Sequence, residues 1–241
     1  MAAGAIAIKL LNELGITFTT YARSIGPVEI RSFSEEEIRN NTLCMPDADA
    51  AAKASAYLEQ CLNSQDSAGG VIECRIKNVP AGLGDTVFDK LDATLAHAIM
   101  SIGAVKAVEI GDGINVTRLT GSEDNDGFVQ KNGIISKTSN HAGGIMGGMS
   151  DGSDIILRAH IKPTPSISQS QSTVTNTGEN LELEIKGRHD PVIVPRAVVV
   201  VEAMAALTIT DALFNNMSAR MDRIHELSAV ISHFDLSDKK L

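Results

Sequence analysis

Three short segments of the sequence combine residue types that bind anions. The first, 140–152, reads Asn-His-Ala-Gly-Gly-Ile-Met-Gly-Gly-Met-Ser-Asp-Gly and holds five glycines within ten positions. Such glycines allow positive φ angles and let backbone amides approach a phosphate closely. This glycine-rich loop lacks the Gly-Lys-Ser/Thr of a P-loop and the spacing of a dinucleotide-binding motif. A flexible surface loop is therefore the alternative interpretation, and a glycine-rich stretch alone favours it.

The second segment is Lys162-Pro163-Thr164-Pro165-Ser166. Its prolines remove backbone donors and stiffen the chain, which leaves Lys162 and two hydroxyl groups free to face a ligand. Before it, 155–161 alternates apolar residues with Arg158 and His160, which predicts a strand with one apolar and one largely basic face. Because this strand joins the glycine-rich loop to Lys162, we expect the two segments to lie side by side as a phosphate cradle. A proline-stiffened loop without a ligand is the alternative.

The third segment is Lys186-Gly187-Arg188-His189-Asp190-Pro191. Arg188 can bind an anion through two parallel hydrogen bonds, and Asp190 could orient either His189 or Arg188. A solvated turn is the alternative. A fourth candidate, Asp211, lies in an otherwise apolar helix, where a buried carboxylate is costly unless it is paired. We expect Asp211 to be either a structural partner or an acid/base group.

Other site types have little support in the sequence. The histidines show no metal-ligand spacing, so we predict no metal site. No Gly-x-Ser-x-Gly motif and no candidate cysteine nucleophile is present, which argues against a hydrolase. The three cysteines form no CxxC motif, and this sparse, odd number predicts a reducing, cytoplasmic location.

Composition narrows the class of protein further. The 241 residues carry 21 Lys+Arg and 30 Asp+Glu, a net charge of −9, with 3% aromatic residues and no Trp. This argues against a nucleic-acid binder and predicts an aliphatic core. The N-terminus lacks the pattern of a signal peptide. The apolar run 197–214 contains Glu202 and Asp211, so we predict a buried core helix and not a membrane span.

Periodicity predicts the elements that position these segments. We expect one domain over 1–241. Its predicted helices are 2–14, 48–63, one capped by Asp85 and carrying Phe88, and 195–219, with 220–241 as a peripheral tail helix. Its predicted strands are 16–25, 28–33, 72–76, 105–110 and 155–161, with a hairpin of 171–176 and 181–186. The first helix should bury Ile6, Leu10 and Leu14 together with Ala7 and Leu11, and 34–47 and 121–152 should be irregular.

Taken together, the motifs closely resemble chorismate synthase. The resemblance rests on Gly82-Leu83-Gly84-Asp85-x-Val87-Phe88-Asp89-Lys90-Leu91-Asp92-Ala93, on Met100-Ser101-Ile102-Gly103-Ala104-Val105-Lys106 and on the three anion-binding segments, followed by Arg196-Ala197-Val198. Order and spacing agree to about residue 220. Each motif alone is weak evidence, but five motifs in register are strong evidence.

The resemblance implies a lyase that removes phosphate from 5-enolpyruvylshikimate 3-phosphate to give chorismate and requires reduced FMN. It implies an α+β fold, a layered β-α-β sandwich with long helices between two largely antiparallel sheets, assembled as a homotetramer. The positions that match FMN contacts of the family are Gly103, Ala104, Gly147, Lys162, Pro163, Thr164, Pro165, Ser166 and Arg188. Asp211 matches a carboxylate near the flavin that assists proton handling at N5. Whether NADPH or a separate flavin reductase supplies the electrons stays open.

The sequence also departs from the family pattern. The N-terminal motifs Gly-Glu-Ser-His-Gly, Arg-Pro-Gly-His and Ser-Ser-Ala-Arg-Glu-Thr, which include both catalytic histidines of the family, do not occur here. Gly103, Ile114 and Val199 stand where Asn, Phe and Pro are common. We therefore expect a chorismate synthase chain truncated at its N-terminal side. The alternative is an inactive fragment that keeps the oligomerisation surface and part of the flavin pocket.

Overall fold

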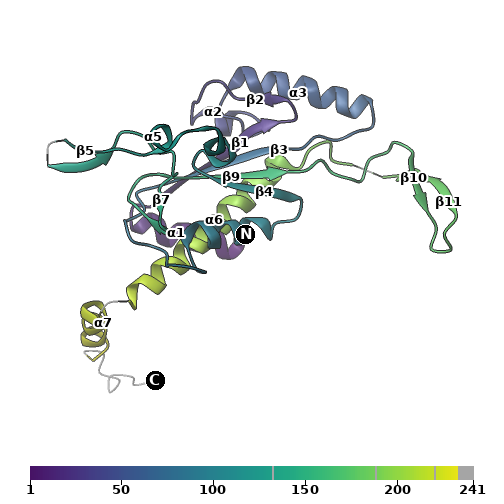
Figure 1. The fold of residues 1–241 in the computed structure, drawn as a ribbon. Helices are drawn as coiled ribbons and strands as arrows, with labels where there is room; N and C mark the ends of the chain where they lie inside the picture. Colours follow the sequence, from purple (N-terminus) through teal and green to yellow (C-terminus); the bar gives the residue numbers. More distant parts are fainter. Residues whose placement is uncertain (132, 188, 220, 233–241) are drawn as a thin grey trace.

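The computed structural model describes residues 1–241 except 132, 188, 220 and 233–241 (Figure 1). Its centre is a five-stranded antiparallel sheet with the strand order β2-β1-β3-β9-β4. The strands are β1 (Thr17–Ile25), β2 (Val28–Glu29), β3 (Gly70–Lys77), β4 (Val105–Ile110) and β9 (Ile155–Ile161). Along β9, Ile155, Leu157, Ala159 and Ile161 are buried, which confirms the predicted apolar face.

Three helices cover one face of this sheet and α3 (Ala48–Asn63) lies on the other side (Figure 1). The three are α1 (Ala2–Glu13), α4 (Leu91–Met100) and α6 (Val194–Met217), and both α1 and α4 contact α6. A Cβ at Gly4 would lie 2.4 Å from the Cβ of Ala203, so α1 and α6 approach very closely at this point. By length and composition alone α6 could cross a membrane, but here its inner side packs in the core as the sequence predicts.

Shorter elements surround this layer pair. The hairpins β5–β6 and β10–β11 project from opposite sides of the molecule (Figure 1). The hairpins comprise β5 (Phe128–Lys131) with β6 (Ile134–Lys137), β7 (Ile145–Met146) with β8 (Met149–Ser150), and β10 (Gln171–Val174) with β11 (Asn180–Leu183). The remaining helices are α2 (Glu37–Asn40), the 3₁₀ helix η1 (Gly113–Arg118), α5 (Gly121–Asp124) and α7 (Met221–Ser232).

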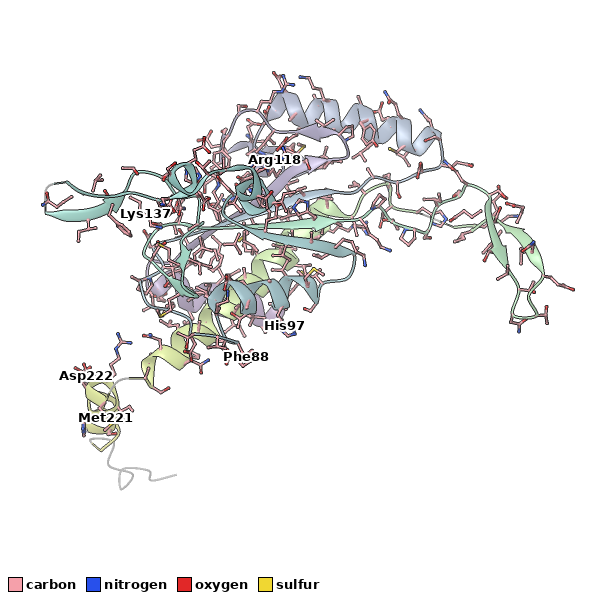
Figure 2. The ribbon with its side chains drawn as sticks, in the orientation of Figure 1. Phe88, His97, Arg118, Lys137, Met221 and Asp222 are labelled. Carbon is pink, nitrogen blue, oxygen red and sulfur yellow. The ribbon has the colours of Figure 1, made fainter. Side chains whose placement is uncertain are left out.

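Two predicted elements are wrong for a shared reason, because tertiary hydrogen bonds override a local pattern. The predicted helix at Asp85 begins only at Leu91, whose amide donates to the carbonyl of Gly148 at 2.7 Å. Residues 85–90 form a loop in which Phe88 is 88% exposed (Figure 2). The predicted strand 28–33 ends at Glu29, because the amides of Arg31 and Ser32 donate to the Asp47 carboxylate at 2.8 and 2.9 Å.

Two further predictions need correction. Helix α1 buries Gly4, Ala7 and Leu11, whereas Ile6 and Leu14 are 72% and 58% exposed, because the helix turns its glycine and alanine toward α6. The segment 121–152 is not irregular throughout, since it contains α5 and four short strands. Local pairing thus organises much of a segment whose composition alone suggested a loop.

The predicted α+β class with antiparallel pairing is confirmed. In the described residues the helices have a large sheet on one side only, and every sheet other than the five-stranded one has two strands. The helices α1 and α6 carry exposed apolar residues, including Ile6 of α1 and Val199 and Phe214 of α6. We call these three residues the outer helix face.

Candidate functional site

Two of the predicted anion-binding segments meet at one hollow of about 290 Å³. We call it the Ser166–His189 hollow, since Ser166 Oγ lies 2.8 Å from His189 Nδ1. Its walls come from the end of α3, from the residues after β9 and from the residues before α6. The lining residues are Leu62, Gln65, Asp66, Ser67, Ser166, Ile167, Ser168, Gly187, His189, Asp190 and Pro191.

The hollow is held together by backbone contacts between segments that are distant in the sequence. The amide of Ala68 donates to the carbonyl of Pro191 at 2.7 Å, and Ala68 also forms a parallel bridge with Val192. Ser67 Oγ donates to the carbonyl of Thr164 at 2.7 Å. The residues just before β3 therefore fix both predicted segments, which the sequence separates by some twenty residues.

Gly103 and Ala104 lie next to Lys162, the first residue of the segment that leads to this hollow. The amide of Lys162 donates to the carbonyl of Ala104 at 2.9 Å, and the next residue, Val105, pairs with Ile161. Ala104 has a φ of 71°, a backbone conformation that non-glycine residues adopt rarely. No atom lies within 4 Å of where a Cβ of Gly103 would stand, and both Gly103 and the Lys162 side chain are exposed. This corner is open to a ligand.

The hydroxyl of Thr164 points to the same conclusion. Its Oγ1 atom is buried and has no hydrogen-bond partner among the described residues. A buried hydroxyl without a partner is costly, and a ligand group would remove that cost. The exposed Pro163 and Pro165 on either side offer no amide that could serve instead.

Arg188, predicted to bind an anion, lies outside the described residues. Its neighbour Asp190 does not bond to His189 in the described residues. Instead it forms a two-pronged ion pair with Arg196, with N–O distances of 2.5 and 3.1 Å. His189 is oriented by the carbonyl of Ile185, which lies 2.9 Å from its Nε2 atom.

Asp211 lines a different cavity, of about 490 Å³, which we call the Asp211 pocket. It lies between the C-terminal half of α6 and the loop before α4, and its lining residues are Gly84, Asp85, Asp89, Thr94, Thr208, Asp211, Ala212, Asn215, Asn216 and Ala219. The expectation of a buried carboxylate is wrong, because Asp211 is exposed; Asn215 Nδ2 lies 3.4 Å from its Oδ2. The carboxylate thus has an ordinary helical neighbour and free access to the pocket.

The glycine-rich loop lies at the Asp211 end of the molecule. Met149 forms a bridge with Gly84, which lines the Asp211 pocket. Gly147 is exposed, has a φ of 61°, and has no atom within 4 Å of a Cβ built on it. A ligand could therefore approach its backbone closely.

The prediction of a phosphate cradle with Gly147 beside Lys162 is wrong, because the two residues do not lie side by side within one chain. The loop enters β9 at Ile155 and Lys162 follows its other end, so the strand holds the two apart by roughly 20 Å at about 3.3 Å per residue. The predicted basic face of β9 is also not free. Arg158 pairs with Glu73 at 2.7 Å, and His160 lies 3.2 Å from Glu109.

The residues that sequence reasoning missed include a buried charge, Glu73, on the sheet face opposite α6. Its carboxylate is fully buried and accepts hydrogen bonds from Tyr21, Arg23, Arg75 and Arg158. We call these five residues the Glu73 cluster. Burial by itself raises the pKa of this carboxyl, but the Tyr21 hydroxyl and the arginines outweigh it and lower the pKa to about 2. A glutamate between Ile72 and Cys74 inside a predicted strand was the available signal.

A second missed group is the pair of His141 and Asp112. Their Nδ1 and Oδ2 atoms lie 2.6 Å apart, and this hydrogen bond raises the pKa of His141. Nearby, Asp126 accepts from the amides of His141 and Ala142 at 2.8 and 3.1 Å and holds the start of the glycine-rich loop. These contacts fix the backbone conformation at the start of the glycine-rich loop.

Comparison with known proteins identifies relatives of one kind. A family model described as chorismate synthase matches residues 1–214. A chorismate synthase from Agathobacter rectalis is 63% identical over 226 residues, covering 93% of this chain and 62% of the relative. One from Methanosarcina mazei is 48% identical over 221 residues, covering 90% of this chain and 60% of the relative. A crystal structure of chorismate synthase matches with a TM-score of 0.76 at 29% identity, covering 96% of this chain and 67% of that one. The chain thus spans less than two thirds of the length of these curated relatives.

Proposed function

Because this chain belongs to the chorismate synthase family, we propose that its residues serve an enzyme that removes phosphate from 5-enolpyruvylshikimate 3-phosphate to give chorismate. The reaction is a carbon–oxygen lyase reaction of aromatic amino-acid biosynthesis, and we propose reduced FMN as its cofactor. The observation that carries the proposal is the meeting of the predicted anion-binding segments 162–166 and 186–191 at one hollow.

The residues of the segment 162–166, which enters this hollow at Ser166, fit a phosphorylated, hydroxyl-rich cofactor. Lys162 supplies an exposed cation, Ser166 and Thr164 supply hydroxyl groups, and the Thr164 Oγ1 atom has no partner within the described residues. Gly103 and Ala104 leave their corner open. When bound, reduced FMN would supply a transient loan of electron density as the phosphate of the substrate departs.

The chain's own residues have separate tasks in this proposal. Lys162 and Arg188 stabilise negative charge on phosphate groups, as cationic donors do in sites that exclude water. Asp211 holds or passes a proton at its carboxylate, which has free access to a pocket. Pro163 and Pro165 keep the Lys162–Ser166 segment stiff, so that its side chains are positioned before the ligand arrives.

We also propose that the chain works as a homo-oligomer in the cytoplasm, with a tetramer favoured over a dimer. The outer helix face is exposed and apolar, and closed symmetric contacts are the usual way to bury such a face. Electrons would come from NADPH or from a separate flavin reductase.

Flavin titration tests the cofactor assignment. Because the chain has no Trp, binding is followed through the fluorescence of FMN itself. We expect Arg188→Ala to weaken FMN binding by about 1.5–3 kcal/mol, the usual cost of a lost hydrogen bond to a charged group. Lys9→Ala, which removes an exposed cation on α1, is the control and should leave binding unchanged. Equal affinities of the Arg188→Ala variant and the parent chain would contradict the proposal.

The alternative is a chain that binds flavin without turning over. It is favoured by the absence of the two histidine motifs that the resemblance leads one to expect. An anaerobic assay of phosphate release with chemically reduced FMN separates the two. For these 241 residues alone we expect flavin binding without release, and release above the rate without protein would contradict the alternative.

A further inference from the structure

Lys137 is a buried lysine that contacts two buried aspartates. It is the last residue of β6 and lies at the base of the projecting β5–β6 hairpin (Figure 2). Its Nζ atom lies 2.5 Å from Asp151 Oδ2 and 3.4 Å from Asp126 Oδ2. The side chains of Lys137, Asp151 and Asp126 are 5%, 10% and 3% exposed, so the two aspartates share this lysine as a counter-ion away from water. We call these three residues the Lys137 bridge.

The two aspartates of the bridge hold opposite ends of the glycine-rich loop. Asp126 accepts hydrogen bonds from two amides at the start of the loop, as described above. Asp151 lies near the other end, where its carboxylate accepts from the amide of Ser153 at 2.9 Å. Its own amide donates to the carbonyl of Gly144 at 3.0 Å. Lys137 therefore connects the beginning of the loop to its end through side chains alone.

The residue before Asp151 connects the loop to the wall of the Asp211 pocket. Ser150 is buried, and its Oγ atom accepts from the amide of Leu83 at 2.9 Å. Its carbonyl accepts from the amide of Gly82 at 2.8 Å. The carbonyl of Gly82 in turn accepts from Asn216, which lines the pocket, at 2.9 Å. A displacement at the end of the loop would therefore reach this wall.

The charges of the bridge explain why the loop stays closed. Burial raises the pKa of both carboxyls, but hydrogen bonds and the charge of Lys137 outweigh it and lower both pKa values, so both aspartates are ionised at neutral pH. Without the lysine, two negative charges would share one buried site with no counter-ion. The loop could relieve this repulsion only by separating its ends or by binding a proton. A buried ion pair adds little net stability over an apolar replacement, but here it fixes a geometry.

We propose that Lys137 is a positioning residue that closes the glycine-rich loop at its two ends, so that Gly147 is presented to a ligand and the neighbouring wall of the Asp211 pocket keeps its shape. Lys137 acts through Asp126 and Asp151, because its Nζ atom contacts both of them. The closing of the loop is a property of the free chain. The presentation of Gly147 rests on the proposed function, with FMN as the ligand.

Hydrogen exchange of the free chain tests the closing of the loop. Lys137→Met keeps the approximate length of the side chain and removes its charge. We expect the amides that donate to the two aspartates, those of His141, Ala142 and Ser153, to exchange at least about 10-fold faster in this variant, because breaking a buried ion pair is costly. Exchange within β3 should not change. Lys9→Met, which removes an exposed lysine of α1, is the control.

Two results of this measurement would overturn the proposal. Unchanged exchange of the loop amides in Lys137→Met would mean that the bridge does not close the loop. An equal acceleration throughout β3 would mean that the lysine stabilises the whole fold and has no local role in positioning the loop.

The double variant Lys137→Met/Asp151→Asn separates the charge of the lysine from its packing. It removes one carboxylate charge together with the lysine, and the new amide group can donate to Asp126 while its oxygen still accepts from Ser153. We therefore expect loop exchange to return most of the way to the rate of the parent chain. Exchange as fast as in Lys137→Met would mean that the stem of the lysine holds the loop, and this would overturn the proposal.

FMN titration, followed by the fluorescence of the flavin, connects the loop to ligand binding. We expect Lys137→Met to weaken FMN binding by about 3- to 10-fold, as for one lost hydrogen bond from the loop backbone, and the double variant to restore it. Faster loop exchange without loss of FMN affinity would overturn the positioning role. A parent chain that binds no FMN would refute the proposed function and the presentation of Gly147 with it. The exchange comparison would still decide whether Lys137 closes the loop, so the two failures are distinguishable.

Discussion

Replacing Glu73 by glutamine tests whether the Glu73 cluster stabilises the fold. The side chain of Glu73 is fully buried, whereas its three arginine partners are 30%, 36% and 16% exposed. Glutamine keeps the shape of the side chain and removes its charge. The arginines and the Tyr21 hydroxyl would then face a neutral group at the centre of the sheet, and breaking a buried ion pair in this way is usually costly.

The expected cost follows from the pKa of Glu73, which is lowered from 4.5 to about 2 in the fold. At about 1.4 kcal/mol per pH unit, this corresponds to roughly 3 kcal/mol of folding free energy at pH 7. Because the pKa is lower in the folded state, the stabilisation is complete above the ordinary pKa and is lost as the pH falls from about 4.5 toward 2. The difference between the parent chain and Glu73→Gln should therefore be largest at neutral pH and narrow in acid.

Urea unfolding at pH 7 and at several values below 4.5 measures this difference. Glu29→Gln is the control, because Glu29 is 59% exposed and pairs only with Arg23, at 3.0 Å. Such a surface pair contributes about 1 kcal/mol or less. Equal stability of Glu73→Gln and the parent chain at pH 7 would refute the reasoning. A difference that stays constant down to pH 3 would refute it as well.

Three further predictions concern activity, assembly and the glycine-rich loop. The 241-residue chain alone should release no phosphate from 5-enolpyruvylshikimate 3-phosphate under anaerobic conditions with reduced FMN. The reason is that no described group replaces the two family histidines. Release well above a protein-free control would contradict this prediction. Light scattering at micromolar concentration should show a homo-oligomer, with a tetramer favoured, and a stable monomer would count against burial of the outer helix face. Gly111→Ala should destabilise the fold by at least about 1 kcal/mol more than Gly15→Ala. Both glycines have positive φ, but only a Cβ at Gly111 would lie 2.0 Å from a backbone oxygen, that of His141. Equal urea midpoints of the two variants would contradict this close approach of the two backbone segments.

Sequence patterns predicted the elements whose stability is local. The helix 48–63 was predicted with the bounds that α3 has, because its apolar spacing is contained in the segment, and in the structure Asp47 caps its first turn. The apolar face of β9 followed from strict alternation. The same Asp47 also binds the amides of Arg31 and Ser32, and this distant use of the carboxylate is why the predicted strand 28–33 ends early. Nothing in the sequence of either segment predicts that Asp47 contacts the amides of Arg31 and Ser32.

In the candidate site, too, the features determined by local sequence were predicted and those that depend on distant contacts were not. The segments 162–166 and 186–191 were each predicted from their residue types, and the structure brings them together. Their meeting depends on Ser67 and Ala68, small residues just before β3 whose types do not indicate a binding site. The orientation of the His189 ring depends in turn on the backbone carbonyl of Ile185. An argument from residue types cannot predict a contact to a backbone oxygen.

The misplaced cradle shows how connection along a chain can be mistaken for proximity. The glycine-rich loop and Lys162 are joined by β9, and a strand in a sheet is a rigid spacer that keeps its ends apart. The same holds for α6, which begins beside the hollow and carries Asp211 roughly 26 Å further along at about 1.5 Å per residue. Both connectors pack in one core and cannot shorten without unfolding it. A motion within one chain is therefore a poor way to unite Gly147 and Asp211 with Lys162 and Ser166. If all four residues serve one flavin, the extended cofactor must span the gap between the two groups within one copy, or the two groups must come from different copies.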